Sequence, residues 1–255
     1  MTSSRTLLLG ALLALFLPAV PKAALIEQEQ FNQANALLEK GDLDKAQEIY
    51  ATLVRKGFGG TALAYNLGNI AYRKGERGKA ILWYERARML SPRDGDVQFN
   101  LAMARSHLKD EKDPLIQSII STFTENELAA TLLLLLWIFF GVFGALRLGW
   151  IEGELWPAAT LWTSGLFLLL TASWLGLSLF FGQTPAAVVT QSPGEVRNGP
   201  GNDYAVGFTV PEGSKVIVLN QRPDWIQIGV PQQGLKGWVK TNEIETVRFT
   251  SASSS

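Results

Sequence analysis

Three apolar runs interrupt an otherwise mixed sequence, and the first lies near the N-terminus. Residues 7–20, LLLGALLALFLPAV, follow a short segment whose only basic side chain is Arg5, and they precede PKAA. This arrangement predicts that residues 1–24 are a secretory signal peptide. Pro21 or Lys22 stands where the cleavage site prefers a small residue, so an uncleaved N-terminal anchor is the alternative.

The second and third apolar runs predict two membrane-spanning helices. No charged residue occurs between Glu127 and Arg147. A helix over these nineteen residues would be about 29 Å long, close to the thickness of a hydrocarbon core of about 30 Å. We therefore predict transmembrane helices over residues 128–148 and 155–182. Thr124, followed by Glu127, resembles a capping box at the start of the first helix.

The segment before the first span carries apolar residues at helical spacing. It predicts an amphipathic helix over residues 111–127, lying in the interface with membrane lipid. The alternative is that this apolar face packs against the end of the preceding segment. The apolar residues are Leu115, Ile116, Ile119, Ile120 and Phe123.

The number of crossings predicts the topology. The first apolar run directs residues 25–126 across the membrane, whether or not it is cleaved, and two further spans return the C-terminal segment to the same side. We expect the chain in the inner (cytoplasmic) membrane, with both soluble parts facing the periplasm.

Between the first two apolar runs, the sequence repeats with a period of 34 residues. Paired helices with this period are typical of tetratricopeptide (TPR) arrays, and residues 61–92 resemble one TPR unit. We predict an all-α array of about two and a half units over residues 25–110. The residues that recur are Gly41 and Gly75, Ala46 and Ala80, Tyr50 and Tyr84, and Asn32, Asn66 and Asn100.

Gly68 lies in a predicted helix, where glycine costs about 1 kcal/mol relative to alanine. The resemblance to TPR units implies that Gly68 lets the two helices of a repeat approach closely, with Ala80 and Ala87 opposite. It also implies that Leu67 and Tyr84 fill the space between neighbouring units.

Asparagine side chains follow one face of the predicted array. Because each amide both donates and accepts hydrogen bonds, this face suits the backbone of an extended peptide. The TPR resemblance places it in the concave groove; the alternative is that the amides bond to neighbouring helices. A groove that clamps a C-terminal carboxylate is not expected, because Phe31, Asp96 and Asn100 stand where such grooves carry cations. The predicted groove residues are Asn32, Asn35, Asn66, Asn69 and Asn100.

After the third apolar run, short β-rich pieces alternate with Gly, Pro and Asn turns, which predicts a small all-β barrel. VRNGPG, EGSKVIVL and GWVKTNEI resemble a bacterial SH3 (SH3b) domain over residues 186–248, followed by a flexible tail, 249–255. Tyr204, Trp225 and Trp238 are candidates for an aromatic surface that binds Pro-rich or cell-wall peptide. The alternative, favoured for Trp238, is that they close the barrel core.

Composition limits the remaining chemistry. The 23 basic and 23 acidic side chains balance, so nucleic acid is not an expected partner. The chain has no cysteine and one histidine, His107, which we expect to be an ordinary surface residue. No phosphate-binding glycine motif occurs. We therefore predict no catalytic residues, no metal site and no cofactor.

The predicted fold is multidomain: all-α TPR repeats, two transmembrane helices and an all-β SH3-like barrel. In this order, the modules resemble the TPR membrane proteins of the Bat aerotolerance operons, the BatE family. That resemblance implies that the protein acts together with von Willebrand factor A-domain membrane proteins and a MoxR-type ATPase. Their complex would serve oxygen tolerance or the response to envelope stress. The leading hypothesis is a non-enzymatic scaffold for protein or peptide ligands. The alternatives are an SH3b-based cell-wall (peptidoglycan) sensor and an accessory subunit of an envelope enzyme.

Overall fold

The structure, a computed structural model, describes most of the chain between Lys22 and Arg248. Most of the predicted signal segment (residues 1–21), most of the predicted interfacial helix and the C-terminal tail lie outside the described residues. The chain divides into two compact units, one ending at Gly59 and the other beginning at Gly60. The described ranges are 22–108, 122–150, 155–182, 185–191, 194–231 and 233–248.

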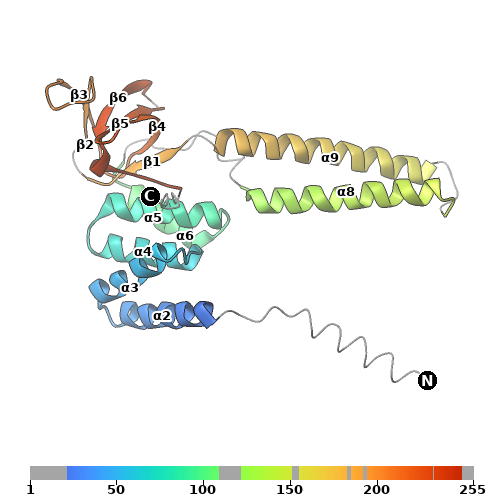
Figure 1. The fold of residues 1–255 in the computed structure, drawn as a ribbon, viewed down its shortest axis with the longest axis horizontal. Helices are drawn as coiled ribbons and strands as arrows, with labels where there is room; N and C mark the ends of the chain where they lie inside the picture. The colour runs from blue at the N-terminus through green and yellow to red at the C-terminus, as the bar shows by residue number, and fades with distance from the viewer. Residues whose placement is uncertain are drawn as a thin grey trace. The chain divides into compact units, whose positions relative to one another are not determined.

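The first unit contains two helices, α2 (Lys22–Glu39) and α3 (Leu43–Arg55) (Figure 1). Asp42 caps α3, because its side chain accepts a hydrogen bond from the backbone N–H of Lys45. The apolar faces of the helices supply the buried side chains of this unit: Ala34, Leu38, Ala46, Tyr50 and Leu53.

The second unit begins with three helices, α4 (Thr61–Arg73), α5 (Arg77–Leu90) and α6 (Gly95–Arg105). Asp94 caps α6 by accepting hydrogen bonds from the backbone N–H groups of Asp96 and Val97. Helices α2 to α6 thus supply two helix pairs and one further helix.

Gly68 lies at a close contact between α4 and α5, as predicted, but the residue opposite it differs from the expectation. A Cβ atom on Gly68 would lie 2.5 Å from Cε1 of Tyr84. The ring of Tyr84, rather than Ala80 or Ala87, therefore occupies the space that glycine leaves. Ala87 instead packs with Ala64 of α4 and Val97 of α6.

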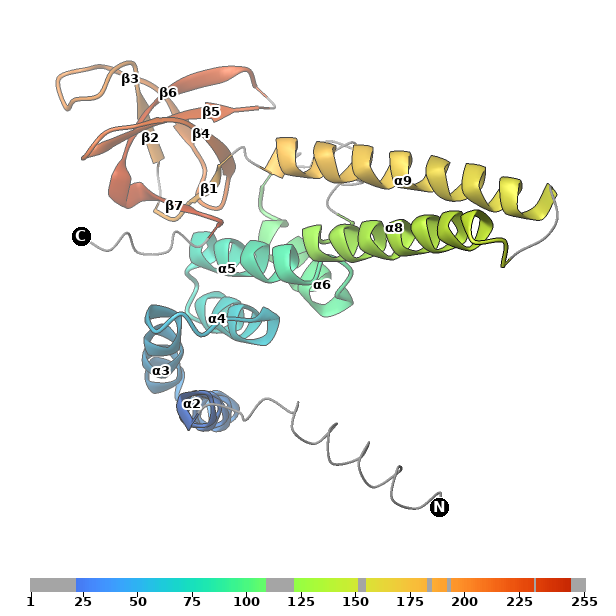
Figure 2. The same cartoon turned by 45° about the vertical axis from the view of Figure 1, so that its right-hand side comes forward.

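Two long apolar helices follow, α8 (Glu125–Arg147) and α9 (Leu155–Gly182), which lie side by side in Figures 1 and 2. Thr124 and Glu127 form the predicted capping box at the start of α8. The last three residues of the segment predicted as an interfacial helix, 125–127, belong to this first turn. By length and composition, both helices are suited to cross a membrane.

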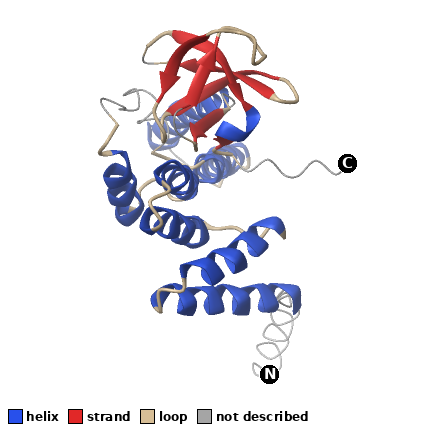
Figure 3. Ribbon diagram, turned by 90° about the vertical axis from the view of Figure 1, so that its left-hand side faces the viewer, coloured by secondary structure: helices blue, strands red, loops and turns tan. Residues whose placement is uncertain are grey.

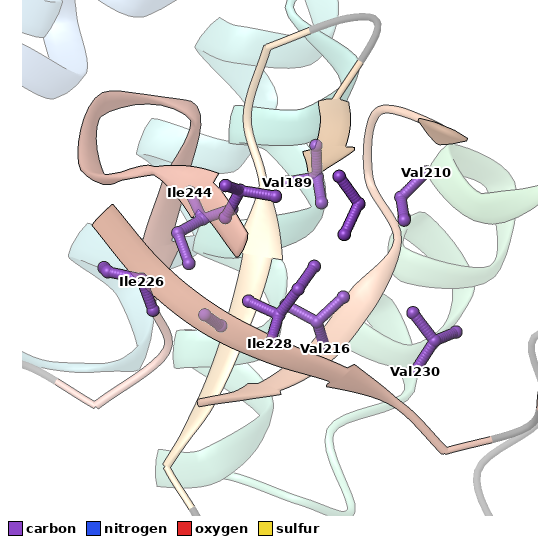
Figure 4. Close-up of a cluster of buried hydrophobic side chains, with 10 residues drawn as sticks. Val189, Val210, Val216, Ile226, Ile228, Val230 and Ile244 are labelled. Carbon is purple, nitrogen blue, oxygen red and sulfur yellow. The ribbon is translucent and has the colours of Figure 1, made fainter. Parts of the chain in front are cut away.

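The C-terminal part is one antiparallel sheet, in the order β3-β2-β6-β5-β4-β1-β7 (red in Figure 3). Its inward side chains form an aliphatic core that includes Val189, Val216, Ile226 and Ile228 (Figure 4). This confirms the predicted fold class. The strands are β1 (Ala186–Val189), β2 (Gly194–Arg197), β3 (Val206–Val210), β4 (Lys215–Gln221), β5 (Trp225–Val230), β6 (Leu235–Lys240) and β7 (Ile244–Thr246).

The contact between Gly68 and Tyr84 predicts a difference between two Gly→Ala variants. Gly68→Ala should lower the free energy of unfolding by about 1 to 3 kcal/mol, because the buried Tyr84 ring must move. Gly95→Ala is the matched control: Gly95 is helical and has no atom within 4 Å of its added Cβ. It should be neutral or slightly stabilising. Chemical unfolding of the detergent-solubilised chain measures both, and equal stabilities would contradict the close approach.

Candidate functional site

A tyrosine–asparagine hydrogen bond recurs in the two complete helix pairs. The hydroxyl of Tyr50 donates to Oδ1 of Asn35 over 2.5 Å. The hydroxyl of Tyr84 donates to Oδ1 of Asn69 over 2.8 Å. Both residues of the second bond lie 34 positions after those of the first. Each bond ties the first helix of a pair to the second, so these amides have a structural role.

Asn100 continues this network from α6 to α4. Its Nδ2 donates to the hydroxyl of Tyr65 over 2.7 Å and to Oδ1 of Asn69 over 3.2 Å. Oδ1 of Asn69 thus accepts two hydrogen bonds, which matches the two lone pairs of a carbonyl oxygen. The structure therefore brings Asn69 and Asn100 together and joins them by a hydrogen bond within the array.

The other predicted amides differ in their surroundings. Asn32 lies in the first unit, is exposed, and accepts a hydrogen bond from Gln28 one turn earlier over 3.1 Å. Asn66 is half-buried on α4. The alternative that the amides bond to neighbouring helices thus describes Asn35, Asn69 and Asn100, and their role toward a ligand stays a prediction.

A series of aromatic residues was not predicted from the sequence. Phe31, Tyr65 and Phe99 recur at the period of 34, each directly before an asparagine of the predicted groove. The rings of Phe31 and Tyr50 lie 5.7 Å apart, and those of Tyr65 and Tyr84 lie 6.0 Å apart. Phe99, in contrast, is 65% exposed. The FN, YN and FN dipeptides were the signal that could have revealed this series.

The three aromatic candidates of the sheet domain are not equivalent. Tyr204 is half exposed, and Trp225 is half-buried at the start of β5. Trp238 is only 8% exposed, and the guanidinium of Arg222 lies 5.1 Å from its ring centroid. The burial of Trp238 agrees with the alternative that it helps to close the barrel, whereas Tyr204 offers an accessible ring.

A buried polar contact joins α5 to the sheet. Arg86 is 5% exposed, and its guanidinium donates to three acceptors at the end of β7. These are Oε1 of Glu245 at 2.8 Å, the carbonyl oxygen of Thr246 at 2.8 Å and that of Val247 at 3.2 Å. In Figure 2, β1 and β7 lie against α5. A buried arginine with several acceptors is stabilised by charge-assisted bonds.

Glu85, the neighbour of Arg86, is fully buried and surrounded by cations. Its carboxylate pairs with Arg88 of α5 at 2.9 Å, with Arg105 of α6, and with Lys215 of β4 at 3.7 Å. Burial alone raises the pKa of the Glu85 carboxyl, but the charges of Lys215, Arg105 and Arg88 outweigh this effect and lower the pKa to about 2. Glu85 therefore links the repeats to the sheet as an ionised carboxylate.

The turn between β3 and β4 completes this contact. The backbone N–H of Gly78 donates to Oε1 of Glu212 over 2.7 Å. A Cβ atom on Gly213 would lie 2.5 Å from Cδ1 of Ile81. His107, expected to be an ordinary surface residue, places its Nε2 3.2 Å from the carbonyl oxygen of Glu212. Close backbone approach and polar contacts thus occur together.

Comparison with known sequence families assigns both modules. Residues 192–245 match the sequence model of the bacterial SH3 domain, and residues 62–94 match that of the tetratricopeptide repeat. A search of curated proteins found no match to the chain. The chain therefore contains a TPR module and an SH3b module, which are types that typically bind proteins, peptides or cell wall. Among the described residues, no group of three His, Cys, Asp or Glu side chains is placed to hold a metal ion.

The lowered pKa of Glu85 predicts an acid-dependent loss of stability. Because this pKa falls from 4.5 to about 2 on folding, its ionised form stabilises the folded chain above pH 4.5. The contribution, about 3 kcal/mol, disappears as the pH falls towards 2. Unfolding measurements between pH 6 and 2 should show that wild type loses about this much more stability than Glu85→Gln. Parallel pH profiles would contradict the assignment.

Proposed function

We propose that this chain is a non-enzymatic, membrane-anchored scaffold that binds protein or peptide partners through its TPR and SH3b modules. One observation carries the proposal: α5 and the SH3b sheet are in direct, buried contact, although two apolar helices separate them in the sequence. Two modules in contact must lie on the same side of a membrane. Helices α8 and α9 therefore form a hairpin that crosses and returns.

The predicted signal segment supports a periplasmic location for both modules, with the hairpin in the inner membrane. The BatE-like order of modules supports a Bat-type complex for aerotolerance or envelope stress, with von Willebrand factor A-domain membrane proteins as partners. Such proteins would be held beside the membrane, at the face where α8 begins and α9 ends.

The amide-lined face is the proposed peptide site. Asn66, Asn69 and Asn100 belong to the first helices of successive repeats, where TPR proteins present their ligand-binding groove. Phe99 and Met103 lie one turn apart on α6 and are 65% and 41% exposed. An extended peptide would place apolar side chains on this pair and backbone groups on the amides.

A second candidate function uses the SH3b module as a cell-wall sensor. The exposed ring of Tyr204 and the half-buried indole of Trp225 favour it, since both leave aromatic surface on the SH3b module accessible. Sedimentation with purified peptidoglycan sacculi tests this function. Tyr204→Ala should reduce retention, whereas Lys79→Ala, an exposed change on α5, should not.

The same-side topology predicts a pattern of cysteine labelling. The chain has no natural cysteine, so single cysteines at Lys79, Lys240 and Trp150 can be labelled in intact cells with a maleimide that enters the periplasm but not the cytoplasm. Lys79→Cys and Lys240→Cys should react. Trp150→Cys, in the connection between α8 and α9, should react only after permeabilisation. Labelling of one soluble module without the other would contradict the proposal that α8 and α9 form a membrane hairpin.

The proposed peptide site predicts weaker partner capture by an Asn66→Ala, Asn69→Ala and Asn100→Ala triple variant. Each lost side-chain bond costs about 0.5 to 1.5 kcal/mol, so binding should weaken by about one to three orders of magnitude. Capture of a von Willebrand factor A-domain protein by the full chain, together with its melting temperature, measures both effects. Tyr84→Phe is the control, because it removes only the internal bond to Asn69. Undiminished capture would count against the site.

A further inference from the structure

The last described helix of the repeats, α6, needs a neighbour. Each unit of a repeat array buries an apolar face against the next, and a terminal unit requires a cap. In this chain the SH3b domain supplies apolar side chains to that position. Its Val188 and Val247 belong to the same buried cluster as residues of α5 and α6, namely Ile81, Leu82, Leu101 and Ala104.

The sheet edge is closed by the same contact. β7 is an edge strand, and its outward carbonyl groups would otherwise be open to another chain. Arg86 of α5 binds the carbonyl oxygens of Thr246 and Val247. Each module therefore satisfies groups that the other leaves unpaired, which distinguishes this contact from a loose association of tethered domains.

The two surfaces also fit without space for larger side chains. A Cβ atom on Gly78 would lie 2.6 Å from the carbonyl oxygen of Val189 in β1. On the SH3b side, Gly213 approaches Ile81 equally closely. Glycine on both sides permits close backbone approach, and Glu212 binds the first turn of α5, where an acidic group is favourable.

We propose that the SH3b domain is the C-terminal cap of the TPR repeats and holds α5 and α6 in the arrangement that aligns Asn69 with Asn100. Three consecutive residues of α5 link this alignment to the SH3b domain. Tyr84 donates a hydrogen bond to Asn69. The next two residues, Glu85 and Arg86, pair with Lys215 and Glu245 of the SH3b domain. Asn100 and Arg105, the α6 partner of Glu85, lie on one helix. Only the use of this alignment for peptide binding rests on the proposed function.

Hydrogen exchange of the full chain in detergent micelles tests the cap without any ligand. Arg86→Ala and Glu212→Ala each weaken the contact, one from each side. Both should accelerate amide exchange in α5 and α6 about tenfold, because the cap no longer opposes local opening. Arg222→Ala, an exposed change elsewhere on the SH3b domain, is the control and should leave exchange in α5 and α6 unchanged.

Cutting the chain between α9 and the SH3b domain distinguishes a domain that caps the repeats from one that is only tethered to them. A protease site placed between Gly182 and Ala186 allows the SH3b domain to be cut from α9. The SH3b domain cut from the wild-type chain should remain bound to the membrane-anchored repeats on gel filtration. The SH3b domain cut from the Arg86→Ala chain should be released, while its own strands stay protected. Release of the wild-type domain with unchanged exchange in α5 and α6 would overturn the proposal. Neither readout involves peptide, so a failure of the proposed peptide site is recognised separately.

Discussion

The buried charges of α5 are the constraint on which the second unit depends. Glu85 and Arg86 are adjacent in the sequence, and both are almost completely removed from water. Burying an unpaired charge is costly, so each must retain its partners from α6 and the SH3b domain. Loss of the SH3b domain would remove Lys215 from Glu85 and Glu245 from Arg86. Helices α4 to α6 and the SH3b domain therefore form one platform.

This platform also limits what the apolar helices can do. Because the segments before α8 and after α9 are in contact, α8 begins and α9 ends on the same side of the helix pair, as the proposed membrane hairpin requires. The start of α8 carries Glu125 and Glu127, which pair with Arg248 and Arg93, respectively. These exposed pairs contribute little stability individually. They join the beginning of α8 to both modules of the platform.

The asparagines show how a residue type proposed for peptide binding also holds the array together. Asn69 uses its oxygen for Tyr84 and Asn100, so part of its hydrogen-bonding capacity is committed inside the array. Such internal bonds fix the rotamer of an amide, and a fixed amide loses less entropy when it meets a ligand. The aromatic residues that precede the asparagines add apolar surface, most of it at Phe99.

The sequence alone predicted the fold class, with helical repeats, two long apolar helices and a C-terminal β domain in this order, because hydrophobic periodicity, the 34-residue repeat and the capping residues Thr124 and Glu127 are local signals. It also identified Gly68 as a point of close approach and grouped Asn69 with Asn100 on one face. Only the tertiary structure placed the Tyr84 ring over Gly68 and revealed the contact of α5 with the SH3b domain. That contact joins residues more than a hundred positions apart, and burial and pairing of charges between distant segments leave no periodic trace in a sequence.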